Sequence, residues 1–209
     1  IIKNKVYLNG PSYNYGIYMY YCQVASNMTG LVANNFIAIN STSTVTNYGL
    51  YEYYCNYLNI YNNSIQVNTS SGTNSYAFYC YYGTANNVVT NIFANQGGGY
   101  AYYLASTSGI TTSNYNNLYS TGSILGYWNG TRANIAAWKA AATPNETYSI
   151  GVNPYFYSTT DLHVYSNLLN AAGTPLSIIK DDIDNQSRNA SIPDIGADEY
   201  GLKAVAITL

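Results

Sequence analysis

The feature that most constrains the fold of this chain is an internal repeat of about 28 residues. A pattern of Asn, any residue and a large apolar residue recurs as Asn4-Lys5-Val6, Asn35-Phe36-Ile37, Asn63-Ser64-Ile65, Asn91-Ile92-Phe93 and Asn117-Leu118-Tyr119. The spacings between these copies are 31, 28, 28 and 26 residues. Self-similarity at this period is typical of solenoids, in which each repeat packs only on its neighbours.

The repeat favours an all-β fold. Apolar residues often return two places further on, as in Leu8, Ile39 and Val67, which is the alternation of a strand with one buried face. Asn tolerates left-handed turns and stacks its amides along parallel strands. No helical pattern separates the strand runs through residue 130, which argues against a βαβ fold. We expect a right-handed parallel β-helix of about five coils, where a coil is one turn of the solenoid.

A second block repeats more tightly. Its copies are YMYYC (18–22), YEYYC (51–55), YAFYC (76–80) and YAYYL (100–104). Aligned without gaps, the last column is apolar and is predicted to point inward, as Cys22, Cys55, Cys80 and Leu104. By period 2 the first and third columns also point inward, as Tyr18, Tyr51, Tyr76, Tyr100, Tyr20, Tyr53, Phe78 and Tyr102. The second column, Met19, Glu52, Ala77 and Ala101, is then predicted to face solvent.

The fourth column of this block is the candidate binding site. It holds Tyr21, Tyr54, Tyr79 and Tyr103, which we expect to form one exposed ladder with a spacing of about 4.8 Å. Flat amphipathic rings can stack on sugar faces and bond through their hydroxyls. Glu52, predicted beside the ladder, is a candidate acceptor for sugar hydroxyls.

The pattern changes at Trp128, and 13 of the 16 charged residues lie from Arg132 onward. A short helix is expected over 134–143, with Asn134 as its cap and Pro144 at its end. We therefore divide the chain into β-helix coils (1–127), a C-terminal capping segment (128–200) that closes the hydrophobic end, and the start of a following domain or linker (201–209). A further strand is expected over 161–164 and a polar loop over 181–191.

The capping segment carries motifs of a known family. NLYSTGSILGYWNGT, NIAAWKAA, NPYF, TDLHV, DDIDNQSR and PDIGADEY (193–200) resemble the closing segment of secreted right-handed β-helix proteins of the pectin-lyase-like superfamily, common in Bacteroidetes. The resemblance implies an extracellular or cell-surface location in a bacterium. It also implies a large multidomain parent protein with sorting modules such as those of type IX secretion. The superfamily spans lyases, hydrolases, adhesins and stalks, so it does not assign an activity.

The coils lack the residues that catalysis on this fold requires. Lyases need acidic Ca²⁺ ligands with an Arg or Lys base, and glycosidases need paired carboxylates. Before Arg132 the charged residues are Lys3, Lys5 and Glu52. We therefore expect a non-enzyme. The alternative, a polysaccharide lyase or hydrolase, places its site in coils that precede this sequence.

The polar residues of the capping segment have mainly structural interpretations. Asp182 and Asp184 begin like a calcium loop but lack its central Gly and closing Glu, so Ca²⁺ is a weak candidate and no other cofactor is expected. Arg188 is instead expected to pair with an acid of the last motif, Asp194, Asp198 or Glu199. His163 is expected to be structural. The three cysteines are expected to be free core thiols.

Two functions remain open from the sequence. The first is adhesion or glycan binding through the tyrosine ladder, with glycans or matrix components as partners. The second is a passive stalk that contacts neighbouring domains of the same polypeptide. Ice binding would need Thr at one strand position per coil, whereas Thr42 and Thr44 lie in a loop. A net charge of −2 and the lack of a 20-residue apolar run argue against nucleic acid and membrane insertion.

Overall fold

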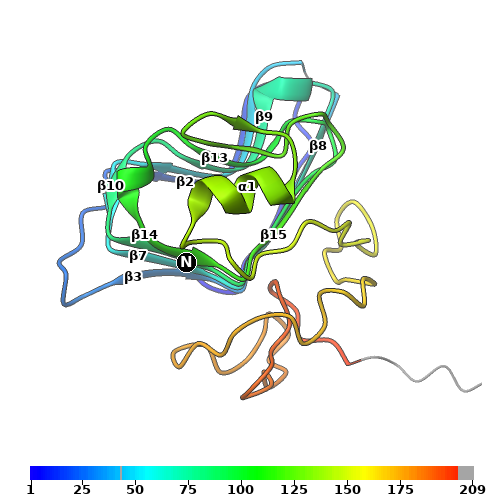
Figure 1. Cartoon of the computed structure of the whole chain (residues 1–209). Coiled ribbons are helices and arrows are strands. Elements are labelled where there is room, and N and C mark those ends of the chain that lie inside the picture. Colours follow the sequence, from blue (N-terminus) through cyan, green and yellow to red (C-terminus); the bar gives the residue numbers. More distant parts are fainter. Residues whose placement is uncertain (43, 202–209) are drawn as a thin grey trace, which may run out of the picture.

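The computed structural model describes residues 1–42 and 44–201, so residues 202–209 of the expected following domain lie outside it. The chain is a right-handed parallel β-solenoid, seen nearly along its axis in Figure 1. The strands are β1 (Lys5–Leu8), β2 (Asn14–Tyr20), β3 (Gly30–Ala33), β4 (Phe36–Ser41), β5 (Asn47–Tyr53), β6 (Cys55–Asn56), β7 (Leu58–Tyr61), β8 (Ser64–Thr69), β9 (Ser75–Cys80), β10 (Gly83–Thr84), β11 (Asn86–Val89), β12 (Ile92–Asn95), β13 (Tyr100–Leu104), β14 (Ile110–Asn114), β15 (Asn117–Ser120), β16 (Gly126–Trp128) and β17 (Thr131–Arg132). The helices are η1 (Gly72–Asn74), η2 (Thr107–Gly109) and α1 (Ile135–Ala142).

Three parallel sheets form the walls of the solenoid. Sheet 1 has the order β1-β4-β8-β12-β15, sheet 2 the order β17-β16-β13-β9-β5-β2, and sheet 3 the order β14-β11-β7-β3. Only the antiparallel β16–β17 pair departs from the parallel arrangement within these named strands. The four strands of sheet 3 give about four complete coils. The parallel β-helix is therefore confirmed, with a smaller number of complete coils than the five expected.

An internal asparagine ladder sets the register at the corner between sheets 3 and 1. Amide Nδ2 of each residue donates to Oδ1 of the next along Asn4, Asn35, Asn63, Asn91 and Asn116, at 2.9, 2.8, 2.9 and 3.1 Å. The sequence assigned the last position to Asn117, which is wrong by one residue. Asn117 instead begins β15 and bonds to Val152 outside the ladder. Because Asn116 is also followed by Asn and Leu, the repeated pattern fits it equally well.

The expected helix closes the core. Asn134 caps α1 by accepting a hydrogen bond from the Ala137 amide at 2.9 Å. Its buried Trp138 lies 5.1 Å from the Tyr102 ring and 5.4 Å from the Trp128 ring, across the end of the solenoid. The helix and its capping role are confirmed. Among the described residues no helix is long and apolar enough to cross a membrane.

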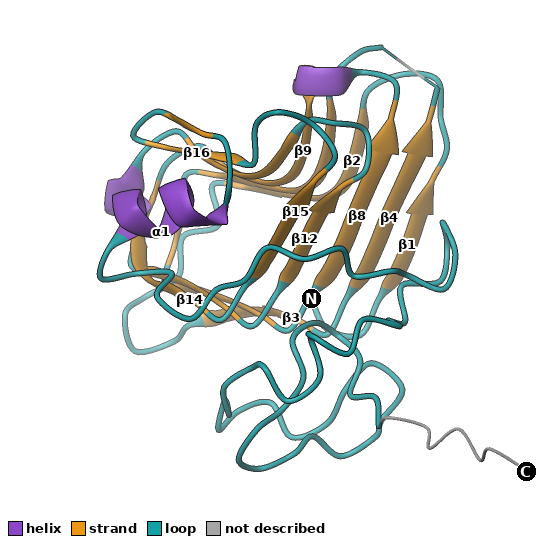
Figure 2. Cartoon of the chain, turned by 45° about the vertical axis from the view of Figure 1, so that its right-hand side comes forward, coloured by secondary structure: helices purple, strands orange, loops and turns teal. Residues whose placement is uncertain are grey.

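After α1 the chain continues the end cap as far as Ile150: Glu146 is buried beside Ser113 and Asn116 of the last coil, and Ile150 bridges to Asn117. Residues 144–200, here called the strap, are loops, and after Ile150 they run along the outer face of sheet 1, as Figures 1 and 2 show. Leu162, Ile183 and Ala197 of the strap pack on Phe36 and Ala38 of β4. A second strap cluster covers the outer face of β12. The strand expected over 161–164 is wrong, because only an isolated bridge forms there.

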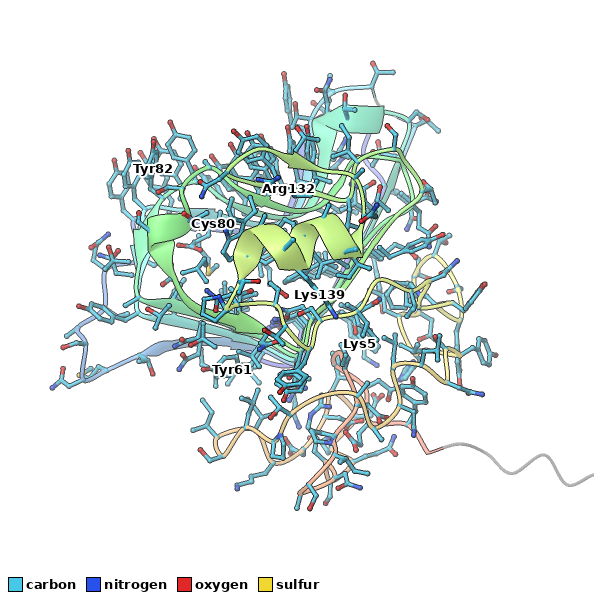
Figure 3. The ribbon with its side chains drawn as sticks, viewed as in Figure 1. Lys5, Tyr61, Cys80, Tyr82, Arg132 and Lys139 are labelled. Atoms are coloured by element: carbon cyan, nitrogen blue, oxygen red, sulfur yellow. The ribbon has the colours of Figure 1, made fainter. Side chains whose placement is uncertain are left out.

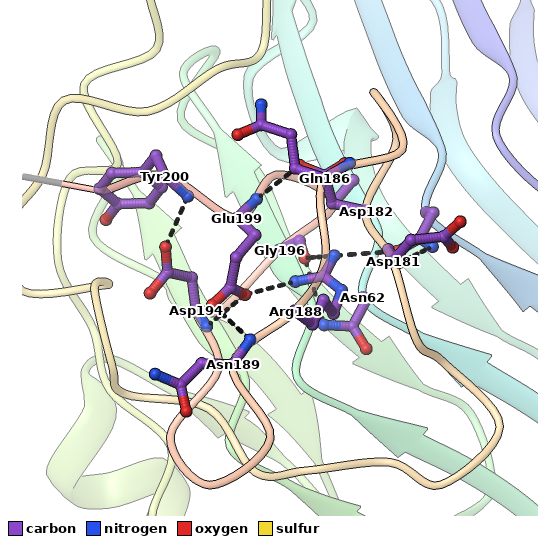
Figure 4. A network of polar contacts seen from close by, with 12 residues as sticks. Asn62, Asp181, Asp182, Gln186, Arg188, Asn189, Asp194, Gly196, Glu199 and Tyr200 are labelled. Atoms are coloured by element: carbon purple, nitrogen blue, oxygen red, sulfur yellow. Dashed lines mark hydrogen bonds and ion pairs between the residues drawn. The ribbon is translucent and has the colours of Figure 1, made fainter.

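The PDIGADEY motif is where the strap is fixed to the coils. Buried Arg188 donates to Glu199 at 3.2 Å, to Asn34 Oδ1 at 2.9 Å and to the Gly196 carbonyl at 2.8 Å (Figure 4). The expected pairing of Arg188 with an acid of this motif is confirmed. Asp194 accepts from the amides of Ala171 and Tyr200 at 2.7 and 2.8 Å. The motif therefore has a structural explanation in this chain.

Gly196→Ala is expected to loosen the strap. Gly196 has φ +105°, and a Cβ there would meet Ile92 Cδ1 at 2.5 Å and Ser64 Oγ at 2.8 Å. We expect a loss of roughly 2–4 kcal/mol, from backbone strain and overpacking together. Thermal unfolding and protease cleavage within the strap measure it. Gly201→Ala, where nothing lies within 4 Å, is the control. Equal stability of the two variants would contradict the proposed docking.

Candidate binding surface

Sheet 2 does not have the register that the YxxYC blocks suggested. In the structure Glu52 pairs with Cys80, and Tyr51 pairs with Tyr79. The gap-free alignment of the second block with the third was therefore wrong by three residues. A better alignment exists in the sequence: YGIYMYYC (15–22), YGLYEYYC (48–55), YAFYCYYG (76–83) and YAYYLAST (100–107). This alignment is anchored on the pattern that opens each copy, Tyr, a small residue, a large apolar or aromatic residue and Tyr, rather than on the cysteine.

In the structure part of the predicted assignment of inner and outer residues is reversed. Residues predicted to face solvent are buried: Met19, Glu52, Ala77 and Ala101. Tyrosines predicted to point inward lie on the outer side instead, as Tyr18, Tyr20, Tyr51, Tyr53, Tyr76 and Tyr100. Phe78, Tyr102, Cys55, Cys80 and Leu104 are buried as predicted. The three cysteines are free, also as predicted, although Cys22 is only partly buried.

Glu52 is consequently not a surface acceptor. Its side chain is fully buried in the coil, between Met19 and Cys80 of the adjacent strands. Oε1 accepts from Asn86 Nδ2 at 2.6 Å, while Oε2 has no hydrogen-bond partner among the described residues. Burial raises the pKa of Glu52 to about 8, against the opposing hydrogen bonds from Cys80 and Asn86. The predicted ligand-binding role of Glu52 is therefore wrong.

The outer face of sheet 2 carries fifteen stacked tyrosines, here called the tyrosine surface. They form four columns that run along the solenoid axis: Tyr15, Tyr48, Tyr76 and Tyr100; Tyr18, Tyr51, Tyr79, Tyr103 and Tyr127; Tyr20, Tyr53 and Tyr81; and Tyr21, Tyr54 and Tyr82. Figure 3 shows Tyr82 among the side chains that project from this side of the coil. The sequence found four members of this surface and missed eleven.

The four predicted tyrosines are on the outside but do not form one ladder. Tyr21 and Tyr54 stack in one column with ring centroids 5.2 Å apart. Tyr79 and Tyr103 stack in another at 4.8 Å. The split follows from the three-residue register error, because Tyr79 is level with Tyr51 rather than with Tyr54.

Stacking decides which part of each ring is available. Most neighbours within a column are near parallel, with centroids 4.6–5.3 Å apart, and only Tyr51 and Tyr79 meet edge to face. Ring faces are therefore occupied by other tyrosines within a column. The surface presents mainly ring edges and hydroxyls, in rows with the spacing of the strands.

Two of the four columns end in a step at the third coil, and the rings of their last tyrosines, Tyr81 and Tyr82, have no further tyrosine of the described chain stacked on them. The Ala105 amide bonds to the Cys80 carbonyl, which places Ala105 level with Tyr81, and Ser106 follows it. Small residues thus replace the fourth tyrosine of two columns. Within the described chain no further ring stacks on the fourth-coil side of Tyr81 or Tyr82. Tyr82 is 40% exposed, and the hydroxyls of Ser106 and Ser108, which follow Ala105 in the chain, lie 2.8 Å from each other. This step, here called the ledge, comprises Tyr81, Tyr82, Ala105 and Ser106.

The tyrosine surface is neutral. Glu52 is the only charged residue in β2, β5, β9, β13 and β16, and it points inward. Burial, with the neighbouring hydroxyls adding to it, raises the pKa of Tyr76 to about 12, and it also raises the pKa of Tyr79. The phenols of Tyr76 and Tyr79 therefore remain protonated at neutral pH. The surface combines aromatic carbon with hydroxyl donors and acceptors and suits an uncharged, hydroxyl-rich ligand.

The two residues of the predicted calcium pair have different partners. Asp182 is buried, and its carboxylate accepts from the amides of Asp184, Gln186 and Glu199 at 2.9, 2.7 and 3.0 Å. Asp184 turns away toward Lys5 and His163. Asp182 therefore organises its own loop.

Searches of protein-family models, of curated proteins and of solved structures found no match to this chain. The tyrosine surface is the feature from which its function has to be inferred.

Proposed function

We propose that this chain is a non-catalytic binding module that holds neutral glycans on the tyrosine surface. The observation that carries the proposal is the array itself: fifteen tyrosines stand on one wall of the coil with no charged side chain between them. A solenoid needs apolar residues inside but imposes no such uniformity outside. Adhesion to a glycan-coated surface at the cell exterior is the corresponding biological role.

The geometry suggests how a sugar chain would lie. Along the columns, hydroxyls and ring edges provide repeated hydrogen-bonding positions. At the ledge, the Tyr82 ring offers a partly exposed face against which a pyranose can stack. We therefore place the strongest contact at the ledge and weaker repeated contacts along the columns.

Tyr82→Ala is expected to weaken glycan binding about 5-fold, because one ring–sugar contact contributes about 1 kcal/mol. The double variant Tyr81→Ala/Tyr82→Ala is expected to weaken it at least about 20-fold. Pull-down with insoluble cellulose, chitin and xylan, together with a glycan array, measures the loss. Tyr155→Ala in the strap, 62% exposed, is the matched control. Binding that survives in the double variant would exclude the ledge.

A passive stalk is the second candidate, and the stacking of rings on one another favours it. If the rings only stiffen the sheet, the ledge variants will lower the unfolding midpoint while no polysaccharide binds the wild-type chain. Binding in the wild type, with little change of midpoint in Tyr82→Ala, would instead favour the glycan role.

A further inference from the structure

We propose that His163, Asp184 and Asp198 bind one divalent transition-metal ion, and that the ion is Zn²⁺. The ion would link three loops of the strap to one another where they cover sheet 1. One ligand atom from each residue lies within 4.8 Å of the other two. The three residues come from separate loops of the strap. This site does not depend on the tyrosine surface and differs from the calcium pair predicted from the sequence.

Contacts at both ring nitrogens and with Phe36 restrict the orientation of the His163 ring. Its Nδ1 contacts Asp161 Oδ1, and its Nε2 lies 2.6 Å from Asp184 Oδ2. The ring edge packs on Phe36 with centroids 5.0 Å apart, which limits its rotation. A carboxylate on the far nitrogen of a metal-binding histidine is the usual orienting arrangement.

Asp198 is the candidate ligand with the fewest contacts to other side chains. Its side chain is only 5% exposed, yet it accepts no hydrogen bond among the described residues. The nearest cationic atom is His163 Nε2, at 4.0 Å, which already faces Asp184. The Asp198 oxygens keep a small solvent-accessible area, and a carboxylate in this position needs water or a cation as its partner. An ion between these side chains would give Asp198 a partner.

The spacing fits a small ion after modest adjustment. With ligands about 2.0–2.2 Å from Zn²⁺, tetrahedral ligand atoms stand about 3.3–3.6 Å apart. The observed Nε2 distances of 2.6 Å to Asp184 and 4.0 Å to Asp198 lie on either side of that value. Oδ1 of Asp184 lies 3.1 Å from Lys5 Nζ, so the ion would bind Oδ2, which faces His163 Nε2 in this structure. The ion replaces the Nε2 proton, which leaves to solvent, and water completes the fourth position.

The choice of Zn²⁺ rests on the ligand set. One imidazole nitrogen with two carboxylates suits Zn²⁺ and its first-row neighbours, whereas Ca²⁺ takes six to eight oxygens. Three carboxylates, those of Asp161, Asp184 and Asp198, face one imidazole and the Lys5 ammonium. This surplus of negative charge favours a divalent cation. Because the strap has only isolated bridges and turns over its described residues 144–200, a metal would fix loops that lack regular strands or helices.

The test is Zn²⁺ titration of the full chain after EDTA treatment and dialysis, with isothermal calorimetry and a chromophoric chelator in competition. We expect one Zn²⁺ per chain and an unfolding midpoint several degrees higher with Zn²⁺ than with EDTA. Co²⁺ in place of Zn²⁺ should give a visible tetrahedral spectrum. No binding by the wild-type chain would overturn the proposal, as would binding of Ca²⁺ in preference to Zn²⁺.

Matched variants assign the ligands. Asp198→Asn should weaken Zn²⁺ binding at least 10-fold, and His163→Ala should abolish it. Asp161→Asn, which alters only the orienting contact, should weaken it 10- to 100-fold. Asp181→Asn removes a charge from the same loop but pairs with Lys3, so binding should be unchanged. Midpoints measured in EDTA show whether each variant folds. Zn²⁺ binding that is unaltered in folded Asp198→Asn would refute the site.

Discussion

Replacing Glu52 by Gln is expected to stabilise the chain at pH 8 by about 4 kcal/mol and to leave it nearly unchanged near pH 4. Burial raises the pKa of Glu52 from 4.5 to about 8, so the folded chain retains a proton that the unfolded chain releases. This contribution to stability is complete below pH 4.5 and is lost as the pH rises through 8. The free energy of unfolding of the wild type should therefore fall between pH 4.5 and pH 8. The contribution of Glu52 to this fall should be absent in Glu52→Gln.

Two variants separate charge from packing at this position. Glu52→Gln keeps an acceptor for Asn86 but cannot ionise. Glu52→Met matches Met19, which stands level with Glu52 on the adjacent strand, and should stabilise at least as much. Asn86 keeps its bond to the Cys55 carbonyl in either case. Thermal unfolding from pH 4 to pH 9 measures the effect, with a midpoint gain of roughly 10 °C at pH 8. If the wild-type and Glu52→Gln curves run parallel across this range, Glu52 is not ionising from a buried state.

Asn63→Ala is expected to destabilise the chain by about 4 kcal/mol, because it breaks the middle of the asparagine ladder. Asn63 Oδ1 accepts from the backbone and side-chain amides of Asn35 at 3.2 and 2.8 Å. Its Nδ2 donates to Asn91 at 2.9 Å and to the Val32 and Tyr61 carbonyls at 2.9 and 3.1 Å. Alanine leaves several of these buried groups without partners and water cannot replace them.

The chain contains a matched control for the ladder. Asn87 is partly exposed on the outer side of sheet 3 and makes one amide contact, to Asn59 at 2.9 Å. Asn87→Ala should therefore cost less than about 1 kcal/mol. Denaturant unfolding of both variants gives the comparison. Similar losses in the two would show that the inner ladder does not stabilise the coils.

The position of the C-terminal segment shows a limit of sequence reasoning. The charge contrast predicted a separate C-terminal segment, and its helix α1 was correctly located. Its path along sheet 1 depends on apolar residues on the outer side of β4 and β12, such as Phe36 and Ile92, which the repeat pattern did not distinguish from core. The cluster of His163, Asp184 and Asp198 forms only because that path brings three distant loops together.

The coil period was determined by the sequence alone, because side chains repeated at one spacing pack best in register. That period fixed the parallel β-helix, the inward Ile and Val residues of sheet 1 and nearly the whole asparagine ladder. The faces of sheet 2 were decided only by the tertiary structure. Gly49 and Leu50 both point into the coil, where a Cβ on Gly49 would meet Ile65 Cγ2 at 2.3 Å. Two successive inward residues break the period-2 rule, and loops of unequal length hide the shift. For that physical reason Glu52 lies in the core, while fifteen tyrosines, rather than the four predicted, form the outer surface.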